Sequence, residues 1–195
     1  MDWRLYKAIY GLSLHHHWLG SLFHAIEQAS IPFMIVITLG LWLAAKPGTS
    51  RKWKLASTGA LLASGLALAT NRIIAAIWFR RRPFIAHHIA HPWINSHDAS
   101  FPSDHASASF AIAFAVVMVD PLVGAVFLLL ALVIAVGRLL IGAHYPGDVA
   151  AGFLIGAASA TVVMRLAQPL VRFIVEHVEK VTDPLLRPFW RSRRA

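Results

Sequence analysis

The chain contains no cysteine, and only 14% of its 195 residues carry a formal charge. The absence of cysteine excludes disulfides, thiolate metal sites, iron–sulfur clusters and cysteine nucleophiles. The scarcity of charge is unusual for a soluble domain, in which about a quarter of the residues are charged. Because 57% of the residues are hydrophobic, the composition argues against a soluble enzyme or a disordered chain and favours a membrane protein.

The charges that are present are mostly basic, with 18 lysines and arginines, 9 aspartates and glutamates, and a net charge of +9. A basic surplus is common in proteins that bind nucleic acid. Here it accompanies apolar stretches long enough to enter a bilayer, so we predict that the partner is a membrane and that there is no nucleic-acid partner.

Five apolar stretches reach or approach the length of about 20 residues that a helix needs to cross a bilayer. They cover residues 18–45, 55–79, 106–119, 121–137 and 149–164. The third is short unless residues 103–105 begin the same helix. In the fifth, Gly152 and Gly156 have the spacing at which membrane helices pack closely. The sequence predicts an all-α polytopic transmembrane bundle of five to six helices in a single domain, 1–195.

Residues 1–17 leave the number of crossings open. Residues 3–14 are too short to cross, and their pattern predicts an interfacial amphipathic helix with Trp3, Tyr6 and Tyr10 at the level of the lipid headgroups. Counted as a crossing, the segment would make six helices with a cytoplasmic N-terminus.

The basic loops predict the orientation, because such loops stay preferentially in the cytoplasm. The protein is therefore expected in the cytoplasmic (inner) membrane, with the loop at 46–54 and the basic tail at 180–195 on its cytoplasmic side. The loops at 80–104 and 138–148 then face the outside. The three arginines at 80–82 lie on the outer side against this rule, and a bound anion would account for them.

The same topology gathers polar residues at the outer face. They are Arg82, Ser103, Asp104, His105, Arg138, His144 and Asp148. Arginine forks and helix N-termini both suit phosphate oxygens. The spacing brings Asp148 close to His144, a candidate nucleophile, and His105 is a candidate general acid.

Each of these features also has a plain structural explanation. Arg82 before a proline is a common helix end, Ser103 is a common helix cap, and a histidine near an aspartate is often only a structural hydrogen bond. Their coincidence on one face favours function. Arg72, deeper in the second stretch, either lines the cavity or pairs with Glu27, and the sequence leaves both open.

The outer loop also holds histidines at spacings that would suit zinc or copper. These are His87, His88, His91 and His97. Because no carboxylate pattern accompanies them, we predict no metal site.

The motifs resemble those of the type-2 phosphatidic acid phosphatase superfamily, Lys-x6-Arg-Pro, Pro-Ser-Gly-His and Ser-Arg-x5-His-x3-Asp. The third motif here is Gly137-Arg138-x5-His144-x3-Asp148. The second is Pro102-Ser103-Asp104-His105, with Asp104 in place of glycine. The first keeps Arg82-Pro83 but has Ala75 at the lysine position. The match covers residues 71–156, and the missing lysine resembles the bacitracin-resistance type of undecaprenyl pyrophosphate phosphatase.

The resemblance implies a role for each matching residue. His144 would attack phosphorus and become a phosphohistidine, Asp148 would orient it, and His105 would protonate the leaving group. Arg82, Arg138 and Ser103 would bind the phosphoryl oxygens. Arg80 or Arg81 would replace the missing lysine. No metal and no cofactor is implied.

The implied substrate is a lipid phosphate, with undecaprenyl pyrophosphate as the leading candidate and its polyprenyl tail lying between helices. Phosphatidylglycerophosphate, phosphatidic acid and lipid A stay open as alternative substrates, as does transfer of the phosphoryl group to another lipid. A lipid-phosphate binder or transporter is the alternative from another class, although it would not need two histidines and an aspartate together. The sequence does not indicate the oligomeric state.

Overall fold

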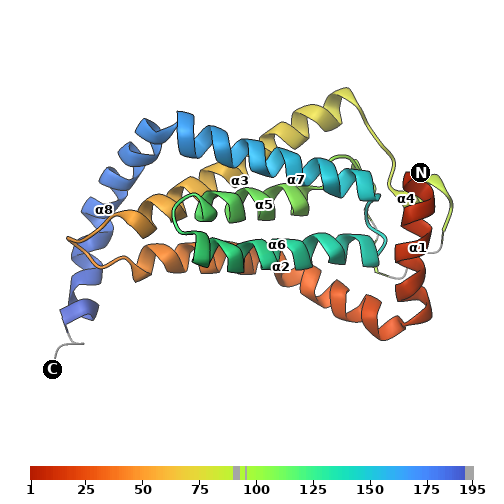
Figure 1. The fold of residues 1–195 in the computed structure, drawn as a ribbon, viewed down its shortest axis with the longest axis horizontal. Helices are drawn as coiled ribbons and strands as arrows, with labels where there is room; N and C mark the ends of the chain where they lie inside the picture. Colours follow the sequence, from red (N-terminus) through yellow and green to blue (C-terminus); the bar gives the residue numbers. More distant parts are fainter. Residues whose placement is uncertain (90–92, 95, 192–195) are drawn as a thin grey trace.

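A computed structural model describes residues 1–89, 93–94 and 96–191, and its regular elements in those ranges are helices and no strands (Figure 1). The helices are α1 (Asp2–His15), α2 (His17–Ala44), α3 (Lys52–Ile77), α4 (Pro83–Ala86), α5 (Asp104–Val117), α6 (Pro121–Leu140), α7 (Pro146–Thr161) and α8 (Gln168–Arg191), with a π-helical turn at Val162–Leu166 after α7. The predicted all-α bundle is confirmed.

In the part of the chain that the structure describes, four helical segments are long and apolar enough to cross a membrane: α2, α3, α6 and α7 with its π-helical turn. The fifth expected crossing, α5, has 14 residues. At 1.5 Å per residue it is about 21 Å long, which is shorter than the roughly 30 Å core of a bilayer. Instead α5 packs against α3, α6 and α7, and Figure 1 shows it running between α6 and α7.

Small residues let α5 and α7 approach closely. A Cβ atom on Gly152 would lie 2.8 Å from Cβ of Ala106, and one on Gly156 would lie 2.8 Å from the carbonyl oxygen of Ser107. Both distances are too short for real side chains, so these two glycines permit the contact. The close packing predicted from their spacing is confirmed.

Local sequence signals define where α5, α6 and α7 begin. Asp120 accepts hydrogen bonds from the backbone N–H groups of Leu122 and Val123 and begins α6. Ser103 occupies the N-cap position of α5, and Pro146 is the first residue of α7. The starts of α5 and α7 lie beside the end of α6, at the same end of the bundle (Figure 1).

Helix α1 lies across this end of the bundle (Figure 1). Tyr6 and Tyr10 on α1 are only 1% and 2% exposed and pack with Tyr145. Gly142, with a φ of 69°, leaves room for the ring of Tyr10, because a Cβ atom there would lie 2.7 Å from it. The depth of these two tyrosines in the membrane stays a prediction. The structure shows that protein covers them and that they attach α1 to the loop before α7.

The sequence did not predict α8, whose second half coincides with the expected basic tail; residues 192–195 of that tail lie outside the described ranges. The helix is attached to the start of α3 by the buried Lys54, whose Nζ lies 2.5 Å from Asp183 and 3.3 Å from Glu179. Figure 1 shows α8 and the loop between α2 and α3 at the end of the bundle opposite α1.

Candidate active site

Three stretches that are far apart in the sequence meet where α5 and α7 begin and α6 ends. They enclose a cavity of about 80 Å³. Its lining residues are Arg82, Asp98, Ala99, Pro102, Asp104, His105, Arg138 and His144. At about 30 Å³ for each water molecule, the volume corresponds to roughly three waters, which is on the scale of one phosphoryl group. The predicted convergence is confirmed for the two arginines and the two histidines.

His144 is 2% exposed and lies between α6 and α7. Its Nδ1 atom is 2.7 Å from the backbone carbonyl oxygen of Ser100, and its Nε2 atom is 3.0 Å from Nη2 of Arg138. A carbonyl only accepts and a guanidinium only donates, so Nδ1 carries the hydrogen and Nε2 the lone pair. Burial, together with the charges of Arg138 and Arg82, lowers the pKa of His144 well below its ordinary value. The imidazole is therefore neutral.

Asp148, which was expected to hold His144 directly, contacts it through an intermediate. Its Oδ2 atom is 3.8 Å from Nδ1 of His144, beyond hydrogen-bond distance. The same carboxylate accepts from the hydroxyl of Ser100 at 2.5 Å and from the backbone N–H of Tyr145 at 2.9 Å. It thus holds Ser100, and the carbonyl of Ser100 holds His144. Ser100 acts partly through its backbone, and no sequence pattern indicates such a role.

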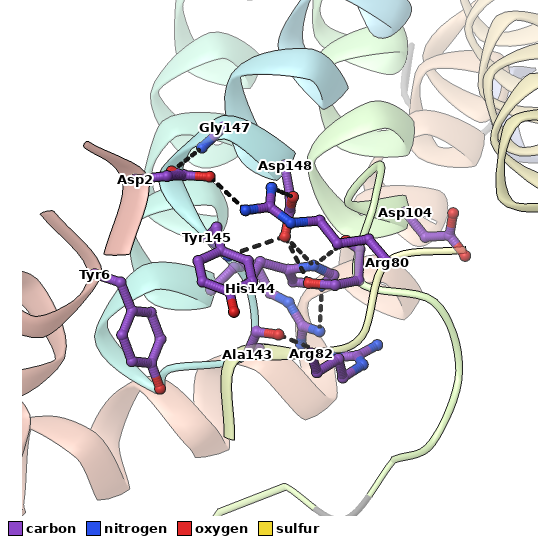
Figure 2. A network of polar contacts seen from close by, with 12 residues as sticks. Asp2, Tyr6, Arg80, Arg82, Asp104, Ala143, His144, Tyr145, Gly147 and Asp148 are labelled. Atoms are coloured by element: carbon purple, nitrogen blue, oxygen red, sulfur yellow. Dashed lines mark hydrogen bonds and ion pairs between the residues drawn. The ribbon is translucent and has the colours of Figure 1, made fainter. Parts of the chain in front are cut away.

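Arg82 is 5% exposed and is held by two acceptors. Its Nε donates to Asp98 at 3.0 Å. Its Nη1 donates to the backbone carbonyl of Ala143 at 3.3 Å (Figure 2). Burial raises the pKa of Asp98, but the hydrogen bond from Ser96 and the charge of Arg82 outweigh it, so the net shift is downward. Asp98 is therefore ionised, and it fixes Arg82 against one wall of the cavity.

Glu27 on α2, a residue the sequence did not assign to the site, joins Arg138 to His105. It forms an ion pair with Nη1 of Arg138, and its Oε1 atom lies 3.3 Å from Nε2 of His105. The Nε atom of Arg138 is buried and has no hydrogen-bond partner among the residues that the structure describes. Arg138 thus keeps a donor available for a ligand in the cavity.

The start of α5 contributes Ser103 and Asp104. Ser103 is at the predicted N-cap position, but its buried hydroxyl makes no hydrogen bond within the described ranges. Asp104 accepts from Nδ2 of Asn71 at 2.8 Å and lies 3.7 Å from Nη2 of Arg72. Arg72 therefore pairs with Asp104 and not with Glu27, and it does not line the cavity.

Arg80 is held by two carboxylates beside the cavity. Its Nη1 and Nη2 atoms lie 2.6 Å from Asp148 and 2.7 Å from Asp2, and its guanidinium is 3.9 Å from the ring centre of Tyr145 (Figure 2). Arg80 was one of the two expected substitutes for the missing lysine, and these contacts already engage its guanidinium. Arg81, the other one, is exposed.

The outer-loop histidines that the structure describes are not grouped into a metal site. His91 lies outside the described residues, and the ring of His87 stacks on Trp3 with a centroid distance of 3.6 Å. Within the described ranges, no group of three or more histidines, aspartates and glutamates is placed to hold a metal ion.

A helical membrane bundle with two buried arginines and a neutral histidine around a small cavity is the arrangement expected of a membrane phosphatase. The model of the PAP2 superfamily matches residues 56–172, which is more than half of the chain. The chain therefore belongs to the PAP2 superfamily, and it is a multi-pass membrane lipid phosphatase, a hydrolase of phosphate esters.

Relatives of known name agree with this assignment. The chain is 30% identical over 190 residues to undecaprenyl-diphosphatase BcrC of Bacillus subtilis (strain 168), covering 96% of each protein. It is 33% identical over 148 residues to decaprenylphosphoryl-5-phosphoribose phosphatase of Mycobacterium tuberculosis (strain ATCC 25618 / H37Rv), covering 68% of this chain and 70% of that protein.

Two solved structures share the fold. The crystal structure of Aquifex aeolicus LpxE has a TM-score of 0.63 at 22% identity, covering 83% of this chain and 93% of that one. The PAP2-type phosphatidylglycerolphosphate phosphatase of Bacillus subtilis also has a TM-score of 0.63, at 20% identity, covering 86% of this chain and 85% of that one.

Proposed function

We propose that the protein hydrolyses undecaprenyl pyrophosphate to undecaprenyl phosphate and inorganic phosphate, without a metal and through a phosphohistidine. The substrate assignment is supported by the similarity to undecaprenyl-diphosphatase BcrC, which extends over nearly the whole of both chains. The chemistry rests on one observation above all, the neutral His144 whose Nε2 lone pair is directed at Arg138 in a phosphate-sized cavity.

In the first step, Nε2 of His144 attacks the terminal phosphorus. Without substrate this lone pair accepts a hydrogen bond from Arg138. When the phosphoryl group enters, its oxygens take the donors of Arg138 and Arg82, and the lone pair becomes free. The bond between phosphorus and the bridging oxygen breaks as undecaprenyl phosphate leaves. His105, which takes up a proton when the negatively charged diphosphate enters the cavity, gives that proton to the bridging oxygen.

In the second step, water replaces His144 on phosphorus. The neutral His105 now takes a proton from the water as its oxygen attacks the phosphohistidine. The bond from nitrogen to phosphorus breaks, His144 recovers its lone pair, and inorganic phosphate leaves. Charge neutralisation by the two arginines, Ser103 and the start of α5 supplies most of the stabilisation, as is general in phosphoryl transfer.

We place the reaction at the outer face of the cytoplasmic membrane. The cavity is lined by Asp104, His105 and Arg138, from the end of the bundle at which α5 and α7 start. The basic segment 46–54 and α8 lie at the opposite end (Figure 1). By the positive-inside rule that end is cytoplasmic, and the cavity then opens outside.

A second candidate is the hydrolysis of a lipid phosphomonoester. The similarity to decaprenylphosphoryl-5-phosphoribose phosphatase favours it, since that name describes the removal of a single phosphate from a polyprenyl lipid. The same two steps would apply, with a sugar hydroxyl as the leaving group.

The test is phosphate release by the purified protein in detergent with EDTA present, from undecaprenyl pyrophosphate and, in parallel, from phosphatidic acid. We expect strong release from the diphosphate, little from phosphatidic acid, and none from the His144→Ala variant. Comparable release from both lipids would replace the proposal with a broad lipid phosphatase. No release by folded protein would favour a binder or transporter, and loss of activity with EDTA would contradict the metal-free mechanism.

A further inference from the structure

An apolar groove lies between α2 and α6 and leads toward the catalytic cavity. Its volume is about 340 Å³. The side chains that line it include Ile26, Ala29 and Phe33 on α2 and Leu130, Val133 and Ile134 on α6. Ser30 also lines it, but its hydroxyl donates to the backbone carbonyl of Glu27 at 2.8 Å, so its hydrogen-bonding capacity is used within the helix. The groove offers a hydrocarbon-like surface.

Pro32 gives a local reason for the groove. A proline inside a helix removes one backbone hydrogen bond and collides with the preceding turn, which bends the helix. Pro32 is inside α2, and Figure 1 shows α2 bent, with its N-terminal half turned toward α1. The bend leaves space between the two helices.

The groove ends about one helical turn from the catalytic cavity. Ile26 is followed by Glu27, and Ile134 is one helical turn before Arg138, about 6 Å along α6 at 1.5 Å per residue. Glu27 and Arg138 form an ion pair between α2 and α6, and Glu27 also reaches His105. The apolar groove therefore lies next to the cationic cavity, and the two together complement a lipid with a phosphorylated head.

We propose that the groove between α2 and α6 holds the part of the substrate's hydrocarbon chain nearest the diphosphate, while the diphosphate displaces Glu27 from Arg138. The inference rests on the proposed function and adds the binding site for the chain. From Ile26 to Phe33 the groove extends about 10 Å along α2, so the rest of a long chain stays in the bilayer.

The groove acts by positioning. Moving a chain from the bilayer into an apolar groove yields little hydrophobic free energy, because lipid tails are already as apolar as leucine. What is gained is close packing and a fixed distance between the chain and the cavity, which brings the phosphorus to Nε2 of His144. A substrate too short to fill the groove does not receive this benefit.

The test fills the groove and compares two diphosphates. Ala29 is exposed and lines the groove, so Ala29→Phe places a ring in it. We expect kcat/KM for undecaprenyl pyrophosphate to fall about tenfold, the size of a moderate packing clash. For inorganic pyrophosphate, which has no hydrocarbon chain, kcat/KM should stay the same. Ala125→Phe is the matched control, an exposed alanine on α6 that does not line the groove, and it should change neither value.

The inorganic pyrophosphate rate also reports that the variant is folded with an intact catalytic cavity. Unchanged hydrolysis of undecaprenyl pyrophosphate by Ala29→Phe would overturn the proposal. An equal fall for both substrates, or an equal fall in Ala125→Phe, would overturn it as well. If the unsubstituted protein hydrolyses neither diphosphate, the proposed function itself fails, which is a different result.

Discussion

The Nδ1 atom of His144 is hydrogen-bonded to the backbone carbonyl oxygen of Ser100 at 2.7 Å. The Ser100 hydroxyl in turn donates to Asp148. Ser100→Ala keeps the carbonyl but loses the hydroxyl, so the segment that holds His144 is less well fixed. We expect kcat for lipid hydrolysis to fall about tenfold, the equivalent of one hydrogen bond, with KM unchanged.

Asp148→Asn provides the comparison. If Asp148 acts through Ser100, both variants should lower kcat and leave KM alone, and the double variant should be no worse than the poorer single variant. An unchanged kcat in Ser100→Ala beside an inactive Asp148→Asn would show that Asp148 contacts His144 directly during turnover.

The role of His105 as general acid predicts a dependence on the leaving group. Removing a general acid typically costs a factor of about 10² to 10⁴. We expect His105→Asn to lose that much activity toward undecaprenyl pyrophosphate. With p-nitrophenyl phosphate, whose leaving group needs no proton, the variant should release a rapid burst of nitrophenolate equal to the enzyme concentration and then slow down, because water attack still lacks its base. A variant without this burst would contradict the assignment.

The ion pair between Glu27 and Arg138 predicts how the protein responds to phosphate. Glu27→Gln leaves a buried arginine without its carboxylate, which typically costs about 3–5 kcal/mol. A phosphate ion in the cavity would restore the neutralisation. We therefore expect the variant to melt at a lower temperature than the unsubstituted protein and to be stabilised more strongly by added inorganic phosphate, as measured by thermal unfolding in detergent. Sulfate-free buffer with sodium chloride at equal ionic strength is the control, and an equal phosphate effect on both proteins would refute the expectation.

The pKa of His144 predicts the pH dependence. An ordinary histidine is half protonated near pH 6.5, but burial and the two arginines lower the pKa of His144 well below that value. Because the neutral form of His144 is the nucleophile, the activity that depends on it is present above the lowered pKa and is lost on the acid side as the pH falls through that pKa. When kcat/KM is measured from pH 4.5 to 8, we expect no acid-side decline that has its midpoint at pH 6.5. An acid midpoint at or above 6.5 would refute the neutral, buried nucleophile.

The bundle was predictable because the relevant signals are local. Apolar runs gave the approximate spans, and Ser103 and Pro146 gave helix starts that the structure reproduces. The arginines and histidines were predictable as a group, since residues at the same ends of successive crossings must meet. Their individual roles stay predictions.

The missed features depend on tertiary contacts. Glu27 is an isolated acid in an apolar run, and nothing local indicates that it reaches Arg138 on another helix. Tyrosine is common at the membrane interface, and no local pattern indicates that Tyr6 and Tyr10 pack against Gly142 and Tyr145. In α8 the internal prolines at 184 and 188 obscured the helical pattern.

The close packing of α5 on α7 predicts a large effect from a single methyl group. Gly156→Ala would place a Cβ atom 2.8 Å from backbone atoms of α5, and these atoms belong to a packed helix that cannot move aside. We expect a destabilisation of about 1–3 kcal/mol, as is typical of overpacking, and a melting temperature lower by several degrees in detergent.

Gly65→Ala on α3 is the matched control, because its Cβ atom would meet nothing within 4 Å. It gains helix propensity of about 0.5–1 kcal/mol and should melt at the same temperature or higher. Equal melting temperatures for the two variants would mean that α5 and α7 separate enough to accept the methyl group, and the positions of Ser103 and Asp148 relative to each other would then not be fixed by this contact.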